Sequence, residues 1–108
     1  MHAIVEQSTL YKHLQLVRTK PRIYLGGHDV GLLSANLYGW KSHRFHVPDN
    51  DPFAGYFYDN FHLFVARKYG ERRKVDWHSV IRAQVPEERA QLALFYDLLA
   101  EFCEAYEP

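Results

Sequence analysis

The stretch KPRIYLGGHDVGLL, residues 20–33, decides how the first half of the chain is expected to fold. Pro21 disfavours helical backbone at the residue before it, so a helix that begins near Ser8 is expected to end near Thr19. Residues 22–25 are then expected to run extended before the two glycines that follow. The stretch therefore predicts a corner between two helices.

The second half of this stretch indicates how the corner ends. Gly26 and Gly27 permit backbone with positive φ and hence a turn, and Asp29 is a favourable N-cap for the next helix. Tyr24 and Leu25 are expected to fill the core beside the turn. The predicted feature is an extended Pro-x-x-Tyr-Leu-Gly corner between the first and second helices.

The helix predicted after this corner carries Leu33, Leu37 and Trp40 on one face. Gly39 inside that helix costs about 1 kcal/mol relative to alanine. We therefore expect another helix to cross close to Gly39.

Three further helices are predicted from start and stop signals. Asp51 and Pro52 are typical of an N-cap and a first helical position, and Gly70 is typical of a helix end. Asp76 suits the N-cap of a short helix, and Pro86 interrupts that helix and opens the last one. The apolar positions expected to face inward are Phe53, Phe57, Phe61, Phe64, Val65, Trp77, Val80, Ile81, Val85, Phe95, Leu98, Leu99, Phe102 and Tyr106.

These patterns predict a single all-α domain over residues 1–108, with about five helices around an aromatic core. Hydrophobic residues make up 47% of the chain and aromatic residues 16%, which is enough for a modest core in a small domain. Cys103 is the single cysteine, so it forms no internal disulfide, and its apolar setting predicts a buried thiol.

The formal net charge is zero, so the whole chain is not expected to attract nucleic acid or membranes. Residues 1–75 carry a net charge of +5, and residues 76–108 carry −5. Either the two parts complement each other within one fold, or the acidic part meets a basic partner. The chain has no apolar leader and no run of about 18 apolar residues, which predicts a cytoplasmic protein.

The glycines of the corner raise the alternative of a phosphate-binding loop. No Gly-Lys-Ser/Thr run follows them, and Gly26, Gly27 and Gly31 are wrongly spaced for a dinucleotide-binding fingerprint. Residues 17–33 resemble one segment of the ATPase domain of gyrase B-type topoisomerases. The chain lacks the later acidic and glycine-rich ATP motifs of that domain and the length for its sheet. We therefore interpret the corner as structural.

Several segments together resemble a known group of proteins. They are the corner residues Pro21, Tyr24, Leu25 and Gly26, the helix ending in Gly39 and an aromatic residue, and the segments FHLFVARKYG (61–70), DWHSVIRA (76–83) and LALFYDLLAEF (92–102). Over nearly its whole length the chain is similar to small, mostly uncharacterised all-helical bacterial proteins, some of which accompany toxin genes as immunity proteins. It departs from their usual corner, which has a glycine–methionine pair at positions 22–23. The resemblance implies a non-enzymatic protein whose partner is a cognate toxin.

Catalytic and metal-binding patterns are sparse. His43 and His46, followed by Asp49 and Asp51, offer imidazole and carboxylate ligands, and a small metal-dependent enzyme is the third hypothesis for function. This spacing would allow the side chains to share a metal ion, but it matches no known metalloenzyme motif. No metal or other cofactor is therefore predicted. Acidic neighbours are expected to raise the pKa of Cys103, which argues against a thiolate nucleophile.

A basic segment supports the second hypothesis, a small nucleic-acid-binding or regulatory adaptor. Residues 67–74 read RKYGERRK, and their cations would contact phosphates while Tyr69 stacked on a base. Glu71 interrupts the segment, so a solvated helix end is the competing interpretation.

The leading hypothesis is a protein-binding module, most concretely an immunity protein that covers the active site of a toxin. Tyrosine and tryptophan are favoured anchors at interfaces, and acidic side chains steer a basic partner. The candidate partner-binding residues are Tyr38, Trp40, His43, Arg44, Asp49, Asp51, Tyr56 and Tyr58 in the 38–58 region, and Asp97, Glu101 and Glu104 on the last helix.

Overall fold

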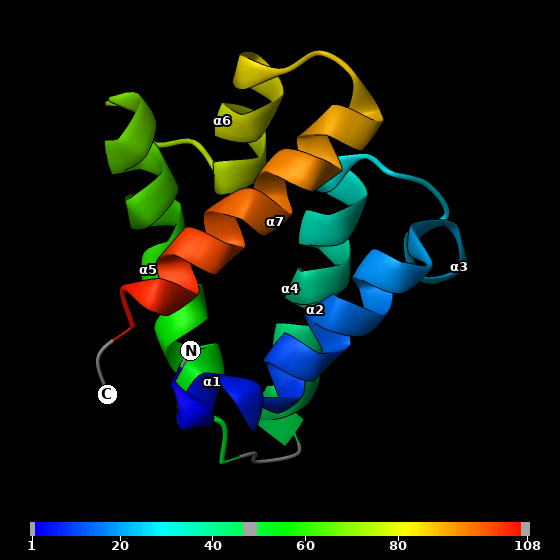
Figure 1. Ribbon diagram of the computed structural model, residues 1–108, viewed down its shortest axis with the longest axis vertical. Coiled ribbons are helices and arrows are strands. Elements are labelled where there is room, and N and C mark those ends of the chain that lie inside the picture. The colour runs from blue at the N-terminus through cyan, green and yellow to red at the C-terminus, as the bar shows by residue number, and fades with distance from the viewer. Residues whose placement is uncertain (1, 47–49, 107–108) are drawn as a thin grey trace.

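The computed structural model describes residues 2–46 and 50–106, with only the backbone described for residues 43–46. This part of the chain holds helices and no strands, so the all-α prediction is confirmed (Figure 1). The helices are α1 (Ala3–Glu6), α2 (Thr9–Thr19), α3 (Pro21–Leu25), α4 (Val30–His46), α5 (Pro52–Tyr69), α6 (Trp77–Gln84) and α7 (Glu88–Glu104). The seven helices of these described ranges exceed the five expected because α1 and α3 are short extra turns.

Helix α7 organises the arrangement of the others. It runs diagonally across the front of the molecule in Figure 1 and contacts α4, α5 and α6. The short α1 contacts α2 and α5, and α3 joins α2 to the start of α4. Across the described ranges, none of these helices combines the length and the apolar character needed to cross a bilayer.

The core is aromatic, as the spacing of apolar residues predicted. Phe61 stacks on Phe57 with ring centroids 4.8 Å apart, and it meets the edge of Phe102 on α7 at 5.3 Å. Such pairs add about 0.5–1.5 kcal/mol each to the stabilisation from burial. Among the positions expected to face inward, Phe64, Trp77 and Val85 are half-buried, and the others are buried.

The corner after α2 differs from the prediction of extended backbone. Pro21 begins the single helical turn α3, because its fixed φ suits the first position of a helix. Lys20 leaves the helical region, with φ −142° and ψ 68°, and its carbonyl accepts the amides of Ile23 and Tyr24. Gly26 then ends the turn with φ 78°.

Side-chain placement at this corner is partly as expected. Leu25 packs against the core, but the prediction that Tyr24 also fills it is wrong, because 41% of its surface is exposed. Helical backbone rotates successive side chains by about 100°, so Leu25 faces the core while its neighbour Tyr24 does not.

Most of the helix ends predicted from capping residues agree with the structure. The hydroxyl of Ser8 accepts the amide of Tyr11 at the start of α2, and a carboxylate oxygen of Asp29 accepts the amide of Gly31 at 2.6 Å. Gly70 ends α5 with φ 65°. The predicted start of the last helix at Pro86 is wrong, because the Glu87 side chain accepts two amides as the N-cap and α7 begins at Glu88, two residues later.

Asp51 is a buried structural residue. One carboxylate oxygen accepts the Ala54 amide at 3.1 Å, and the other accepts the Ser8 hydroxyl at 2.9 Å and the Leu10 amide at 3.0 Å. The side chain therefore caps α5 and also holds the start of α2. Its predicted place in a partner-binding surface is wrong, since only 5% of Asp51 is exposed.

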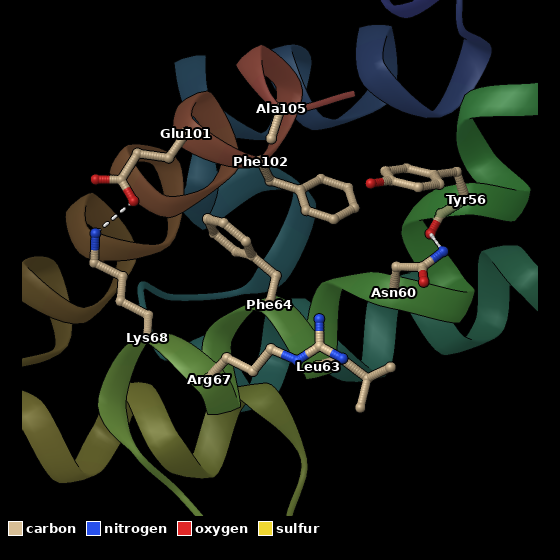
Figure 2. A pocket seen from close by; sticks show the side chains of 9 residues that line it. All are labelled: Tyr56, Asn60, Leu63, Phe64, Arg67, Lys68, Glu101, Phe102 and Ala105. Carbon is tan, nitrogen blue, oxygen red and sulfur yellow. Dashed lines mark hydrogen bonds and ion pairs between the residues drawn. The ribbon is translucent and has the colours of Figure 1, made fainter. Parts of the chain in front are cut away.

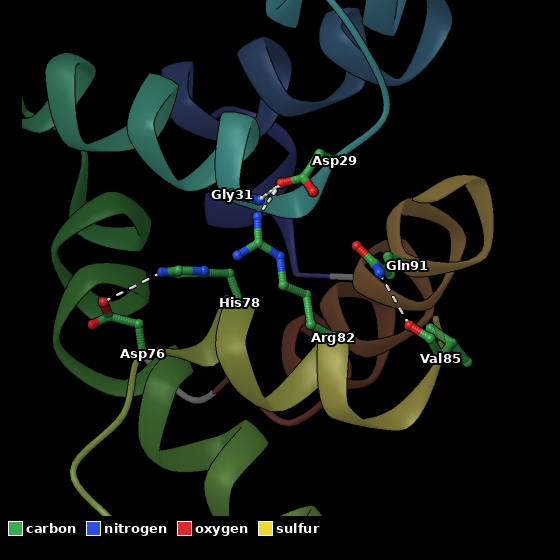
Figure 3. Close-up of polar contacts among 7 residues, drawn as sticks. All are labelled: Asp29, Gly31, Asp76, His78, Arg82, Val85 and Gln91. Carbon is green, nitrogen blue, oxygen red and sulfur yellow. Dashed lines mark hydrogen bonds and ion pairs between the residues drawn. The ribbon is translucent and has the colours of Figure 1, made fainter. Parts of the chain in front are cut away.

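Polar contacts fix α6 between α4 and α7 (Figure 3). Arg82 on α6 pairs with Asp29, the same carboxylate that caps α4. The side-chain amide of Gln91 on α7 donates to the carbonyl of Val85 at 3.1 Å. These contacts link three helices near the α6–α7 turn.

Gly39 has no close neighbour within the described residues. No atom of theirs beyond its own helix lies within 4 Å of the position that a Cβ would take, and the residue is exposed. The prediction that another helix crosses there is wrong, and nothing in the structure explains the glycine.

Candidate interaction surfaces

A surface groove lies between α5 and α7 (Figure 2). Its volume is about 430 Å³. Helical spacing on α5 brings residues from four successive turns to one side, and the last turn of α7 supplies the other side. The lining residues of this α5–α7 groove are Tyr56, Asn60, Leu63, Phe64, Arg67, Lys68, Glu101, Phe102 and Ala105.

The groove has an aromatic floor. Tyr56 stacks on Phe102 at a centroid distance of 5.0 Å, and Phe64 meets the edge of the same ring at 5.5 Å. Phe102 is buried, whereas Tyr56 and Phe64 are half-buried. Leu63 lies at the edge of the groove with 43% of its surface exposed. The floor therefore presents fixed apolar surface to the solvent.

Charged groups border this floor. Lys68 donates to a carboxylate oxygen of Glu101 at 2.5 Å, and this hydrogen bond raises the pKa of Lys68. Arg67 is exposed and forms no ion pair or hydrogen bond with the described residues. The groove thus offers one compensated charge pair and one guanidinium whose donors face solvent (Figure 2).

Two of the predicted partner-binding residues, Tyr38 and Tyr58, lie in a second groove among α4, α5 and the start of α6, with a volume of about 330 Å³. The Tyr58 hydroxyl donates to the carbonyl of Leu37 at 2.8 Å, and Lys41 lies 5.5 Å from the Tyr58 ring centroid. Tyr38 is 73% exposed. This second groove shares no lining residue with the α5–α7 groove.

The remaining predicted residues of the 38–58 region divide into three groups. Trp40 is half-buried and stacks on His13 at 5.9 Å, so it joins α4 to α2. Asp51 is the buried cap described above. The side chains of His43 and Arg44, and all of Asp49, lie outside the described residues.

The predicted acidic face of α7 is exposed but is not one continuous surface. Asp97, Glu101 and Glu104 all face away from the core. Glu101 borders the α5–α7 groove and is neutralised by Lys68, whereas Asp97 lines a different pocket beside α2. The tertiary structure therefore assigns two of these carboxylates to different surroundings.

The basic segment 67–74 is partly neutralised. Glu71 accepts two hydrogen bonds from the Arg73 guanidinium, both at 3.0 Å, and these and backbone amides lower the pKa of Glu71 to about 2. Lys68 is paired with Glu101, and Tyr69 packs against the core. These contacts reduce the cations and the stacking surface available to a nucleic acid.

The described residues contain no group of three histidine, cysteine or acidic side chains placed to hold a metal. Asp51 is already committed to three hydrogen bonds, and the side chains of His43 and His46 lie outside the described part. Cys103 is buried as expected, and burial together with Glu104 raises the pKa of its thiol to about 12. A thiolate nucleophile at this position is therefore disfavoured.

A further exposed surface was missed in the sequence. Four large apolar side chains on α2, α3 and the first turn of α4 face solvent, and the most exposed of them is Ile23 at 73%. For Leu16 and Leu32 the signal available was that they lie off the core face of α2 and α4. The four residues are Leu16, Ile23, Tyr24 and Leu32.

Comparisons of the chain with protein-family models, with curated proteins and with solved structures gave no match. Function is therefore inferred from the geometry of these surfaces.

Proposed function

We propose that this protein is a non-enzymatic binding module that neutralises a cognate bacterial toxin by covering the toxin's active site. The observation that carries the proposal is the α5–α7 groove, an open aromatic floor bordered by a guanidinium without a counter-ion among the described residues. The resemblance to immunity proteins supplies the class of partner. The proposal requires a protein surface and no catalytic group.

The groove combines the residue types that dominate binding energy at protein interfaces. Tyrosine and arginine are enriched among hot spots, and such residues act best beside a well-packed pocket. Tyr56 is held against Phe102 and Tyr106, so little rotational freedom remains to be lost on binding. An apolar side chain of the partner would cover the floor, and a partner carboxylate would meet Arg67.

The acidic character of residues 76–108 suits association with a basic partner. Glu104 lies on α7 beside Ala105, which lines the groove, and it is exposed. It forms no ion pair with the described residues. Charges at the edge of an interface mainly raise the association rate, and salt screens them. Glu104→Lys is therefore expected to slow association, more at low ionic strength than at high; an equal rate for both proteins would remove this role.

The test is co-expression with the product of the adjacent gene. The expected result is that the chain restores growth to cells that express this product and forms a complex with it in a purified system. Leu63→Asp and Arg67→Glu should each weaken the complex at least tenfold, because they place a charge or reverse one beside the aromatic floor.

A matched control is Arg72→Glu, since Arg72 is an exposed cation outside the groove. This variant should protect cells as well as the unchanged chain. A neighbouring product that is not toxic and does not bind would refute the proposal. Full protection of the cells by both groove variants would show that the α5–α7 groove is not the toxin-binding surface.

A further inference from the structure

We propose that a pocket between α2 and α7 binds the phosphate group of a small, hydroxyl-bearing phosphate monoester through Arg18, His28 and Arg89. The pocket has a volume of about 350 Å³ and lies apart from the α5–α7 groove in its lining residues. The three side chains come from the last turn of α2, the connection before α4 and the first turn of α7. Three nitrogen-bearing side chains from three segments therefore border one cavity.

The two guanidinium groups form no ion pair in the part of the fold that the structure describes, although the Glu87 carboxylate interacts with Arg89 at longer range. The ion pairs of the described residues involve Lys68, Arg73, His78 and Arg82 as the basic partners. Arg18 and Arg89 form none, and their side chains make no hydrogen bond there. Arginine presents a planar set of donors that matches phosphate oxygens in pairs. These donors are therefore available to an anionic ligand.

Arg18 is held in place at the pocket. Its guanidinium carbon lies 5.1 Å from the ring centroid of Tyr96, which also lines the cavity. Tyr96 is only 5% exposed, and its hydroxyl donates to the carbonyl of Leu14 at 2.6 Å. A guanidinium stacked on a fixed ring loses less conformational freedom when it binds a ligand.

Arg89 lies where a cation is locally unfavourable. The first turn of a helix carries partial positive charge, which repels a guanidinium. The Glu87 carboxylate accepts the amides of Arg89 and Ala90 at 2.9 Å, and these hydrogen bonds lower the pKa of Glu87. Glu87 and Glu88 thus already offset part of the positive charge at this end of α7, and the Arg89 guanidinium itself remains outside any ion pair of the described residues.

The rest of the lining indicates what the phosphate is attached to. Asp97 is the carboxylate among the lining residues, and it repels anions, the phosphate included, so the phosphate would lie against the cationic side chains while Asp97 accepted a hydrogen bond from a hydroxyl. Leu92 and Ala93 add a small apolar wall. A phosphate has three terminal oxygens for the three side chains that border the site, whereas a carboxylate has two. These features favour the monoester of a small polyol.

The test is calorimetric titration of the full chain with glycerol 2-phosphate, inorganic phosphate and glycerol. Glycerol 2-phosphate should bind more tightly than inorganic phosphate, and glycerol should not bind. Arg89→Gln should weaken binding of the ester about tenfold, the effect of losing one charge-assisted interaction. Arg89 is exposed, so the variant should fold, and an unchanged thermal transition would verify this.

Arg72→Gln is the matched control, because it removes an exposed guanidinium that does not line the pocket. It should leave the affinity for glycerol 2-phosphate unchanged. Absence of binding by the ester, or equal affinity of the Arg89→Gln and unchanged chains, would overturn the site. Equal affinity for inorganic phosphate and the ester would show that the pocket does not recognise the polyol part of the ligand. The result is independent of toxin neutralisation, which Arg89→Gln should preserve.

Discussion

Replacement of Asp51 by alanine is expected to destabilise the protein severely. The carboxylate accepts three hydrogen bonds, from the Ser8 hydroxyl and from the amides of Leu10 and Ala54. Loss of an N-cap costs about 1 kcal/mol, and each donor left buried without a partner costs about 1–3 kcal/mol. Because these terms are not additive, we expect a loss of about 3–5 kcal/mol, a large part of the stability of a small domain.

The assay is urea unfolding followed by circular dichroism, with Asp51→Asn and Asp59→Ala measured beside Asp51→Ala. Asparagine keeps one acceptor oxygen and should give an intermediate loss. Asp59 is on the same helix, but it is exposed and without a hydrogen bond among the described residues, so its replacement should leave stability nearly unchanged. A loss below about 1 kcal/mol for Asp51→Ala would show that the buried carboxylate does not hold α2 to α5.

Four further predictions concern stability. Gly39→Ala and Gly55→Ala should each stabilise the protein by up to about 1 kcal/mol in the same unfolding assay, because both glycines are helical and no atom of a described neighbour lies within 4 Å of the added Cβ. Gly31→Ala should destabilise it, because the added Cβ would meet the Arg82 guanidinium and a carboxylate oxygen of Asp29; a gain in stability there would contradict this close approach. Burial alone would raise the pKa of Asp29, but its hydrogen bonds have the larger effect and leave the pKa below the ordinary 3.8. The contribution of this carboxylate to stability is therefore present above pH 3.8 and is lost as the pH falls through the folded-state pKa. Asp29→Asn should therefore reduce the loss of stability between about pH 4 and pH 2, and identical acid unfolding profiles would refute this. Ile23→Ser should change the free energy of unfolding by less than about 0.5 kcal/mol, because the side chain is 73% exposed; a larger loss would place Ile23 in the core.

The sequence alone determined the features that depend on neighbouring residues. Ser8 and Asp51 begin helices and Gly70 ends one because caps act through hydrogen bonds and φ values within a few residues. The aromatic spacing of α5 and α7 was also visible, because a helical period places every third or fourth residue on one face. These local rules gave the all-α class and most of the core.

Local rules failed where one sequence feature is compatible with two local structures. Residues 21–25 are compatible both with an extended corner and with a short helix, because Pro21 fits either. The structure has the helical turn, and Tyr24 is exposed on it. Pairing with a distant segment was equally hidden, since the second role of Asp51 depends on Ser8, 43 residues away.

Only the tertiary structure decided the candidate sites. Lys68 and Glu101 are 33 residues apart in sequence, and the packing of α5 on α7 makes them one ion pair beside an aromatic floor. Arg18 and Arg89 border one pocket for the same reason, because α2 and α7 approach each other in the folded chain. Sequence reveals which residues a helix exposes; the crossing of helices decides which exposed residues meet.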